Sequence, residues 1–159
     1  MDTTGFFNYP TLPAGSAQDP APVASTDPGF LPYATVAEWD ALLAATETLR
    51  FHPGDVVLRA GERDRAFYLL LDGRVVVEGD EDEILAPATI GVAAFLDGEP
   101  RAVTLLARTH GELARMSWDA YEGLAARDPR LGRTILCDLG RGLAARLRAA
   151  SASLPEWTG

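Results

Sequence analysis

Lysine is absent from this 159-residue sequence, so all 14 basic residues are arginines. They stand against 23 acidic residues and leave a formal net charge of −9. A nucleic-acid-binding surface needs clustered cations that displace counterions, so this acidic balance predicts no nucleic-acid partner. The exclusive use of arginine is typical of high-GC coding, and we therefore expect a bacterial source.

Cysteine and histidine are also scarce. Cys137 is the only cysteine, which excludes an intrachain disulfide and a thiolate metal cluster. We interpret His52 and His110 as solvent-facing or locally hydrogen-bonded, and we expect no metal site. The acidic run at 79–83 lacks the flanking helices and closing Glu of an EF-hand, so we interpret it as a solvated turn. No Ser-His-Asp or Cys-His arrangement is legible, and we expect a protein that is not an enzyme.

Long hydrophobic runs are missing as well. No apolar stretch approaches the roughly 18 residues that a membrane-spanning helix needs. The first basic residue is Arg50, so the positively charged start of a signal peptide is not seen. These features predict a cytoplasmic protein without membrane insertion.

The composition divides the chain into a tail at 1–34, a domain at 35–150 and a short tail at 151–159. The first tail is rich in proline and has no helical or strand periodicity, which favours a linker. It also carries aromatic residues, which a docking peptide uses as anchors in a partner's groove. Both interpretations stay open, and the candidate docking anchors are Phe6, Phe7, Tyr9, Phe30 and Tyr33.

The domain begins with a helix signal and continues with strands. Thr35 and Glu38 form a predicted capping box for a helix that ends near Thr46. Short β-rich runs then alternate with turn signals, among them Asp72-Gly73, which predicts a hairpin. The expected strands are Leu49–Phe51, Val56–Leu58, Ala66–Leu71, Arg74–Glu78, Ile84–Ala86, Val103–Ala107 and Glu112–Met116. This pattern predicts a mainly β fold, a small antiparallel roll or sandwich with flanking helices.

Two helices are expected to close the chain. Ser117 caps a predicted helix from Trp118 to about Ala126, and Asp128-Pro129 begins another. The apolar arc of this last helix is wider than one contact against the roll requires. A second contact, such as the same helix in another subunit, would use the excess, and the residues predicted for it are Leu136, Leu143 and Leu147.

The stretch from Gly91 to Thr104 places a short apolar turn after a glycine and closes it with Pro100-Arg101. It resembles the phosphate-binding cassette of cyclic-nucleotide-binding domains, the β-roll domains of catabolite-activator regulators and of the kinase A regulatory subunit. The resemblance covers about Thr35 to Arg148. Its other marks are Phe51-His52-Pro53-Gly54-Asp55, Ala60-Gly61-Glu62 and Tyr68–Leu71 with Asp72-Gly73.

The resemblance implies a ligand site formed by Gly91, Ala93, Arg101 and Ala102. In the family the arginine, here Arg101, pairs with the cyclic phosphate, and Ala at position 102 goes with a preference for cAMP. The family's Glu, which accepts a hydrogen bond from the ribose 2′-hydroxyl, is replaced by Val92. A charge-assisted hydrogen bond is worth about 1.5–3 kcal/mol, so its loss predicts a weakened or lost nucleotide site. The other interpretation of Arg101 is a surface arginine that bonds local carbonyls.

Two functions follow from these observations. The first is a binding module without chemistry and without a resident cofactor, an accessory subunit that docks through its tail or last helix, with a homodimer as a further partner prediction. The alternative is a working sensor that binds cAMP or a related anion at Arg101 and signals through its last helix. The helix-turn-helix that follows this domain in the family's transcription factors is not seen after Leu147.

Overall fold

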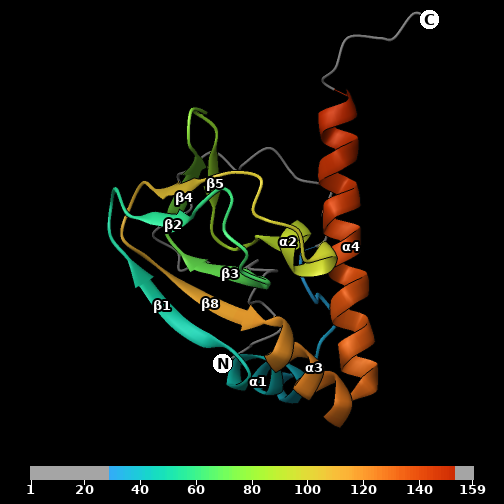
Figure 1. The fold of residues 1–159 in the computed structure, drawn as a ribbon. Coiled ribbons are helices and arrows are strands. Elements are labelled where there is room, and N and C mark those ends of the chain that lie inside the picture. The colour runs from blue at the N-terminus through green and yellow to red at the C-terminus, as the bar shows by residue number, and fades with distance from the viewer. Residues whose placement is uncertain (1–28, 153–159) are drawn as a thin grey trace, which may run out of the picture.

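The computed structural model describes residues 29–152, which form two antiparallel sheets and four helices (Figure 1). The predicted class, an antiparallel β-roll with one N-terminal helix, a short cassette helix and two C-terminal helices, is confirmed. The helices are α1 (Val36–Ala44), α2 (Val92–Asp97), α3 (Trp118–Arg127) and α4 (Pro129–Ala152). The strands are β1 (Glu47–Phe51), β2 (Val56–Leu58), β3 (Ala66–Asp72), β4 (Arg74–Val77), β5 (Glu83–Leu85), β6 (Ala88–Ile90), β7 (Leu105–Ala107) and β8 (Gly111–Ser117).

The roll is built from two four-stranded sheets with strand orders β1-β8-β3-β6 and β2-β7-β4-β5. Their inward faces enclose one apolar cluster, which includes Phe51, Leu70, Val75, Leu105 and Leu113. A second cluster lies between the outer face of β3 and β8 and the helices. Because β3 packs apolar side chains on both faces, its burial is nearly continuous from Ala66 to Leu70.

The hairpin predicted at Asp72-Gly73 is wrong. Strands β3 and β4 belong to different sheets, so the chain changes sheet at Gly73 instead of turning back on itself. Gly73 has φ +94°, and a Cβ there would lie 2.6 Å from the carbonyl oxygen of His110. A glycine is needed at position 73 because the backbone there passes close to the backbone of His110 and Gly111. The Asp-Gly dipeptide alone does not show whether the chain forms a tight turn or passes to the other sheet.

Strand β6 was not predicted. It follows β5 after the cis Ala86–Pro87 bond and pairs with β3, so that Ile90 lies opposite Tyr68. Its three residues are too few for a strand periodicity to be visible in the sequence. The strand matters because it delivers the chain to Gly91, where the cassette begins.

The segment before α1 packs into the core. Phe30 is 6% exposed and contacts Trp39 and Phe67 edge-on, at 6.0 Å between ring centroids in each case. Leu31 is buried beside it, and its backbone N–H donates to the carboxylate of Asp138 on α4 at 3.0 Å. The assignment of Phe30 to a partner is therefore corrected, because its ring is used in this chain's own core.

The predicted helix caps are present. The hydroxyl of Thr35 accepts from the Glu38 amide, and the Glu38 carboxylate accepts from the Thr35 amide. Ser117 accepts from the Ala120 amide and Asp128 from the Leu131 amide. Within residues 29–152, no helix is long and apolar enough to cross a membrane.

Candidate ligand site

The cassette begins where β6 ends. Gly91 has φ +72° and precedes α2, a conformation that most other residues avoid. The first helical residue, Val92, is only 3% exposed and belongs to the apolar cluster between the roll and the helices. The next residue, Ala93, is exposed. The position that carries the family's glutamate is therefore occupied here by a buried hydrocarbon side chain.

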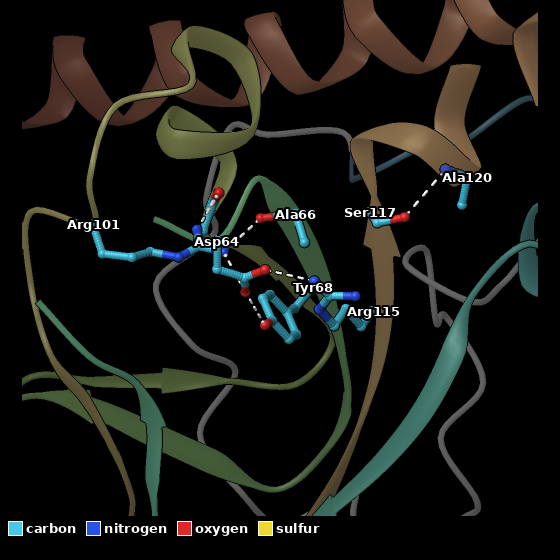
Figure 2. A network of polar contacts seen from close by, with 8 residues as sticks. Asp64, Ala66, Tyr68, Arg101, Arg115, Ser117 and Ala120 are labelled. Carbon is cyan, nitrogen blue, oxygen red and sulfur yellow. Dashed lines mark hydrogen bonds and ion pairs between the residues drawn. The ribbon is translucent and has the colours of Figure 1, made fainter. Parts of the chain in front are cut away.

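Arg101 lies at the other end of the cassette and is 6% exposed. Its backbone is fixed against the turn at 61–62, since its amide donates to the carbonyl of Glu62 and its carbonyl accepts from the amide of Gly61. Its guanidinium turns inward (Figure 2). Nη1 donates to the Gly91 carbonyl at 2.7 Å, and Nη2 donates to the Ala66 carbonyl at 2.7 Å.

The glycine and the arginine fit one another. A Cβ at position 91 would lie 2.5 Å from Arg101 Nη1. The guanidinium therefore occupies the space that any larger residue at position 91 would fill. The sequence predicted that Gly91 and Arg101 share one site, and the structure places them in contact.

Asp64 connects this arginine to a second one. Its carboxylate lies 3.2 Å from Arg101 Nη2 and 2.5 Å from Arg115 Nη2, and it accepts a hydrogen bond from the Tyr68 hydroxyl (Figure 2). Burial by itself would raise the pKa of Asp64, but the hydrogen bonds from Arg115, Tyr68 and Arg101 hold it below its ordinary value. Burial and the neighbouring carboxylate raise the pKa of Tyr68. The Asp64 carboxylate is therefore ionised at neutral pH.

The network is not fully balanced. Two guanidinium groups face one carboxylate, which leaves one positive charge. In addition, Arg101 Nε is buried and has no hydrogen-bond partner among residues 29–152. A buried donor without an acceptor is uncommon in proteins and requires an explanation.

Asp64, Tyr68 and Arg115 were not predicted as parts of this site. Arg115 and Tyr68 come together because they are opposite one another in the β3–β8 register, and Asp64 lies two residues before β3. Periodicity predicts that such strands exist, but it does not give their register. The one visible signal was the charge of Asp64 two residues before an apolar strand.

The remaining candidate residues lie apart from this network. Ala102 is exposed, and Tyr33, at 91% exposure, is the most exposed of the large apolar residues described. On α4, Leu136 and Leu143 are partly buried against the helix-side core, whereas Leu147 is 69% exposed. The anchors Phe6, Phe7 and Tyr9 lie outside the described residues.

The chain folds as a β-roll with a short helix that begins after a glycine, and comparison with known proteins identifies the class of domain. The model of the cyclic nucleotide-binding domain matches residues 48–128, half of the chain. The chain belongs to the cyclic nucleotide-binding domain family.

The chain is similar to several proteins of this family. It is 32% identical over 98 residues to a cAMP-dependent protein kinase regulatory subunit of Hypocrea atroviridis, with 55% of this chain and 21% of that protein covered. The chain thus spans about a fifth of that relative's length. It also resembles a cyclic nucleotide-binding domain of Methylobacillus flagellatus KT, with 26% identity, a TM-score of 0.69, and 78% and 77% of the two chains covered. The catabolite activator protein of Thermus thermophilus, at 23% identity and TM-score 0.65 over 76% of this chain and 58% of its own, shares the fold.

Proposed function

We propose that this chain is a non-enzymatic regulatory or docking module of a larger bacterial assembly, and that its cyclic nucleotide binding is weakened or lost. The observation that carries the proposal is the state of the cassette. Arg101 is buried and donates to two backbone carbonyls and to Asp64, while Val92 lies in the core. A nucleotide phosphate would compete with these internal acceptors for the guanidinium of Arg101.

The expected free energies support weakened nucleotide binding. Hydrogen bonds to a charged group are worth about 1.5–3 kcal/mol each, so the internal acceptors are strong competitors for the guanidinium. Because Val92 cannot accept a hydrogen bond from the ribose 2′-hydroxyl, a similar amount of binding free energy is lost at the sugar. A loss of about 1.5–3 kcal/mol corresponds to roughly 10- to 150-fold in affinity. The ionised Asp64 carboxylate also repels an entering phosphate.

Isothermal titration calorimetry with cAMP, cGMP and cyclic di-GMP tests the proposal. We expect no heat beyond dilution at millimolar nucleotide, and no change in melting temperature. Micromolar binding that disappears in an Arg101→Lys variant would overturn the proposal and establish the site as a working one. Binding that is unchanged in Arg101→Lys would overturn the assignment of the site.

Docking through the tail has its own experiment. The deletion should end at residue 28, because Phe30 and Leu31 are core residues whose removal would disturb the fold itself. We expect the 1–28 deletion to remain folded and to lose co-purification with the partner assembly. Unchanged co-purification would reject the tail as the docking element.

The alternative, a sensor of cAMP or a related anion, is favoured by one specific observation. The network has an excess positive charge, and Arg101 Nε is buried without an acceptor. An anion that entered beside Ala93 would meet that charge. In this case the calorimetric titration gives saturable binding, and its affinity falls when Arg101 is replaced.

A further inference from the structure

The arginines of this acidic chain are concentrated on its last helix. The 24-residue α4 contains five arginines and one acidic residue, Asp138, so its side chains sum to +4. The whole chain has a formal charge of −9, so the remaining residues sum to −13. The excess of positive charge is therefore local to α4, and the net charge of the whole chain does not reveal it.

The rotation of α4 about its own axis is fixed by contacts at both ends. In its first half, Leu131, Ile135 and Leu139 are buried, and the buried Asp138 accepts from the Leu31 amide. In its second half, Arg146 Nη2 donates to the backbone carbonyl of Thr89 on the roll. With one residue every 100° around the helix, these contacts turn the faces that carry Arg133 and Leu147 outward.

The outward side combines an apolar stripe with arginines. Leu136, Leu143 and Leu147 recur at spacings of seven and four residues, which places them in line on one side of the helix. Gly140 lies within this stripe, and a Cβ there would meet nothing within 4 Å among the described residues. Beside the stripe lie exposed arginines that form no ion pair within residues 29–152: Arg130, Arg133 and Arg148.

The surroundings of the stripe leave space for a partner. Figure 1 shows α1 and α3 near the N-terminal end of α4 and α2 beside its middle, with no labelled helix beside the last turns of α4. Leu147, at 69% exposure, is the one large apolar residue of α4 that is exposed among residues 29–152. A partner helix that contacts the outward side would bury Leu147 and approach closely at Gly140.

Charge decides which partner fits this surface. Pairing α4 with the same helix of a second copy would bring the exposed Arg130, Arg133 and Arg148 near their own copies, while Asp138 stays buried and paired with Arg141. Like charges across a helix interface are unfavourable, and complementary flanking charges set the choice of partner. We infer that the outward side of α4, from Arg133 to Arg148, binds an acidic amphipathic helix of another protein, with Leu147 as the apolar anchor and the two arginines as the groups that pair with the partner's carboxylates. This inference names the partner class for the docking role proposed above, on which it rests.

A peptide of known sequence tests the inference on the full chain. The probe is a fluorescent three-heptad peptide with Leu at the a and d positions and Glu at e and g, whose own charge opposes self-association. The matched peptide has Lys in place of Glu. We expect the acidic peptide to bind, as measured by fluorescence anisotropy, and the basic peptide not to bind. Raised ionic strength should weaken the binding at least tenfold, because the charges are exposed.

Variants locate the interaction. Arg133→Glu/Arg148→Glu should weaken acidic-peptide binding at least tenfold, and Leu147→Asp should abolish it. The matched control, Arg50→Glu/Arg59→Glu, changes the net charge equally on exposed residues of the roll and should leave the affinity unchanged. Circular dichroism melting verifies that all variants remain folded.

Three outcomes would overturn the inference. They are no binding of the acidic peptide, equal binding of both peptides, and a stable homodimer by light scattering that Leu147→Asp converts to monomer. None of them depends on nucleotide. Failure here is thus distinguishable from failure of the proposed nucleotide insensitivity, which calorimetry measures separately.

Discussion

The arginine of the cassette and the exposed arginines of the last helix differ in where their charge is directed. Arg101 is turned into the protein, where Gly91, Ala66 and Asp64 accept from it. Arg133 and Arg148 lie on an exposed helix face and form no ion pair among residues 29–152. The first group acts within the fold, and the second is available to another molecule.

Under the proposed function, this difference is how a domain of a ligand-binding family would serve in docking. The cassette keeps its backbone shape, with Gly91 in the left-handed region and Arg101 above it. Its polar groups are directed at each other, and Val92 packs in the apolar core. In this account the arginine still has a role, which is to hold α2, the turn at 61–64 and β3 together.

The largest expected effect comes from removing the inward arginine. Arg101→Met should lower the free energy of unfolding by about 3 kcal/mol, because breaking a buried ion pair leaves a charge and two carbonyls without their donor. Arg115 still pairs with Asp64, which keeps the loss at the lower end of the usual range. Urea unfolding measures this value.

A matched substitution on α4 is the control for Arg101→Met. Arg133→Met removes an exposed arginine and should change stability by less than about 0.5 kcal/mol. Equal losses for the two variants would show that Arg101 is not structurally special.

Two glycines give the next contrast. Gly91→Ala should destabilise the protein by about 2 kcal/mol, because position 91 has a positive φ and the new Cβ would lie 2.5 Å from Arg101 Nη1. Gly140→Ala lies in an open position of α4 and should stabilise by about 0.5–1 kcal/mol. Thermal unfolding of both variants compares them, and a destabilised Gly140→Ala would contradict the open surface on α4.

A smaller effect is expected from pH. The pKa of Asp64 is lower in the folded protein than its ordinary value of 3.8, so the unfolded state takes up this proton first. The contribution of Asp64 is complete above about pH 4 and disappears as the pH falls through the folded-state pKa. Asp64→Asn should therefore show a weaker loss of stability below pH 4 than the wild-type chain. An identical acid profile for both proteins would remove Asp64 from the network.

Tyr68 acts at the other end of the pH range. Its pKa is raised above the ordinary 10.0, so its contribution is complete below about pH 10 and is lost as the pH rises through the folded-state pKa. A Tyr68→Phe variant should reduce this alkaline loss, as measured by urea unfolding at several pH values.

Much of the fold could be predicted from the sequence because its signals are local. The capping box at Thr35, the caps at Ser117 and Asp128, and most strands are set by neighbouring residues and are present as expected. The sheet change at Gly73 could not be predicted, because it depends on the approach of Gly111 from a distant strand. The same holds for Phe30, whose core contacts lie in α1 and β3.

The site could be predicted only in outline. Resemblance placed Gly91 and Arg101 together, but the partners Asp64 and Arg115 depend on the register of β3 with β8. The five arginines of α4 can be counted in the sequence, but which of them are exposed depends on how the helix packs against the roll.

The central claim is that the Arg101 guanidinium stays with its internal acceptors even when cyclic nucleotide is present. Its Nε–H signal in a ¹⁵N–¹H spectrum, assigned by its loss in Arg101→Lys, reports this directly as cAMP is added to millimolar concentration. The account predicts a signal that neither shifts nor broadens. A saturable shift, together with changes in the backbone amides of Gly91 and Ala93, would contradict it.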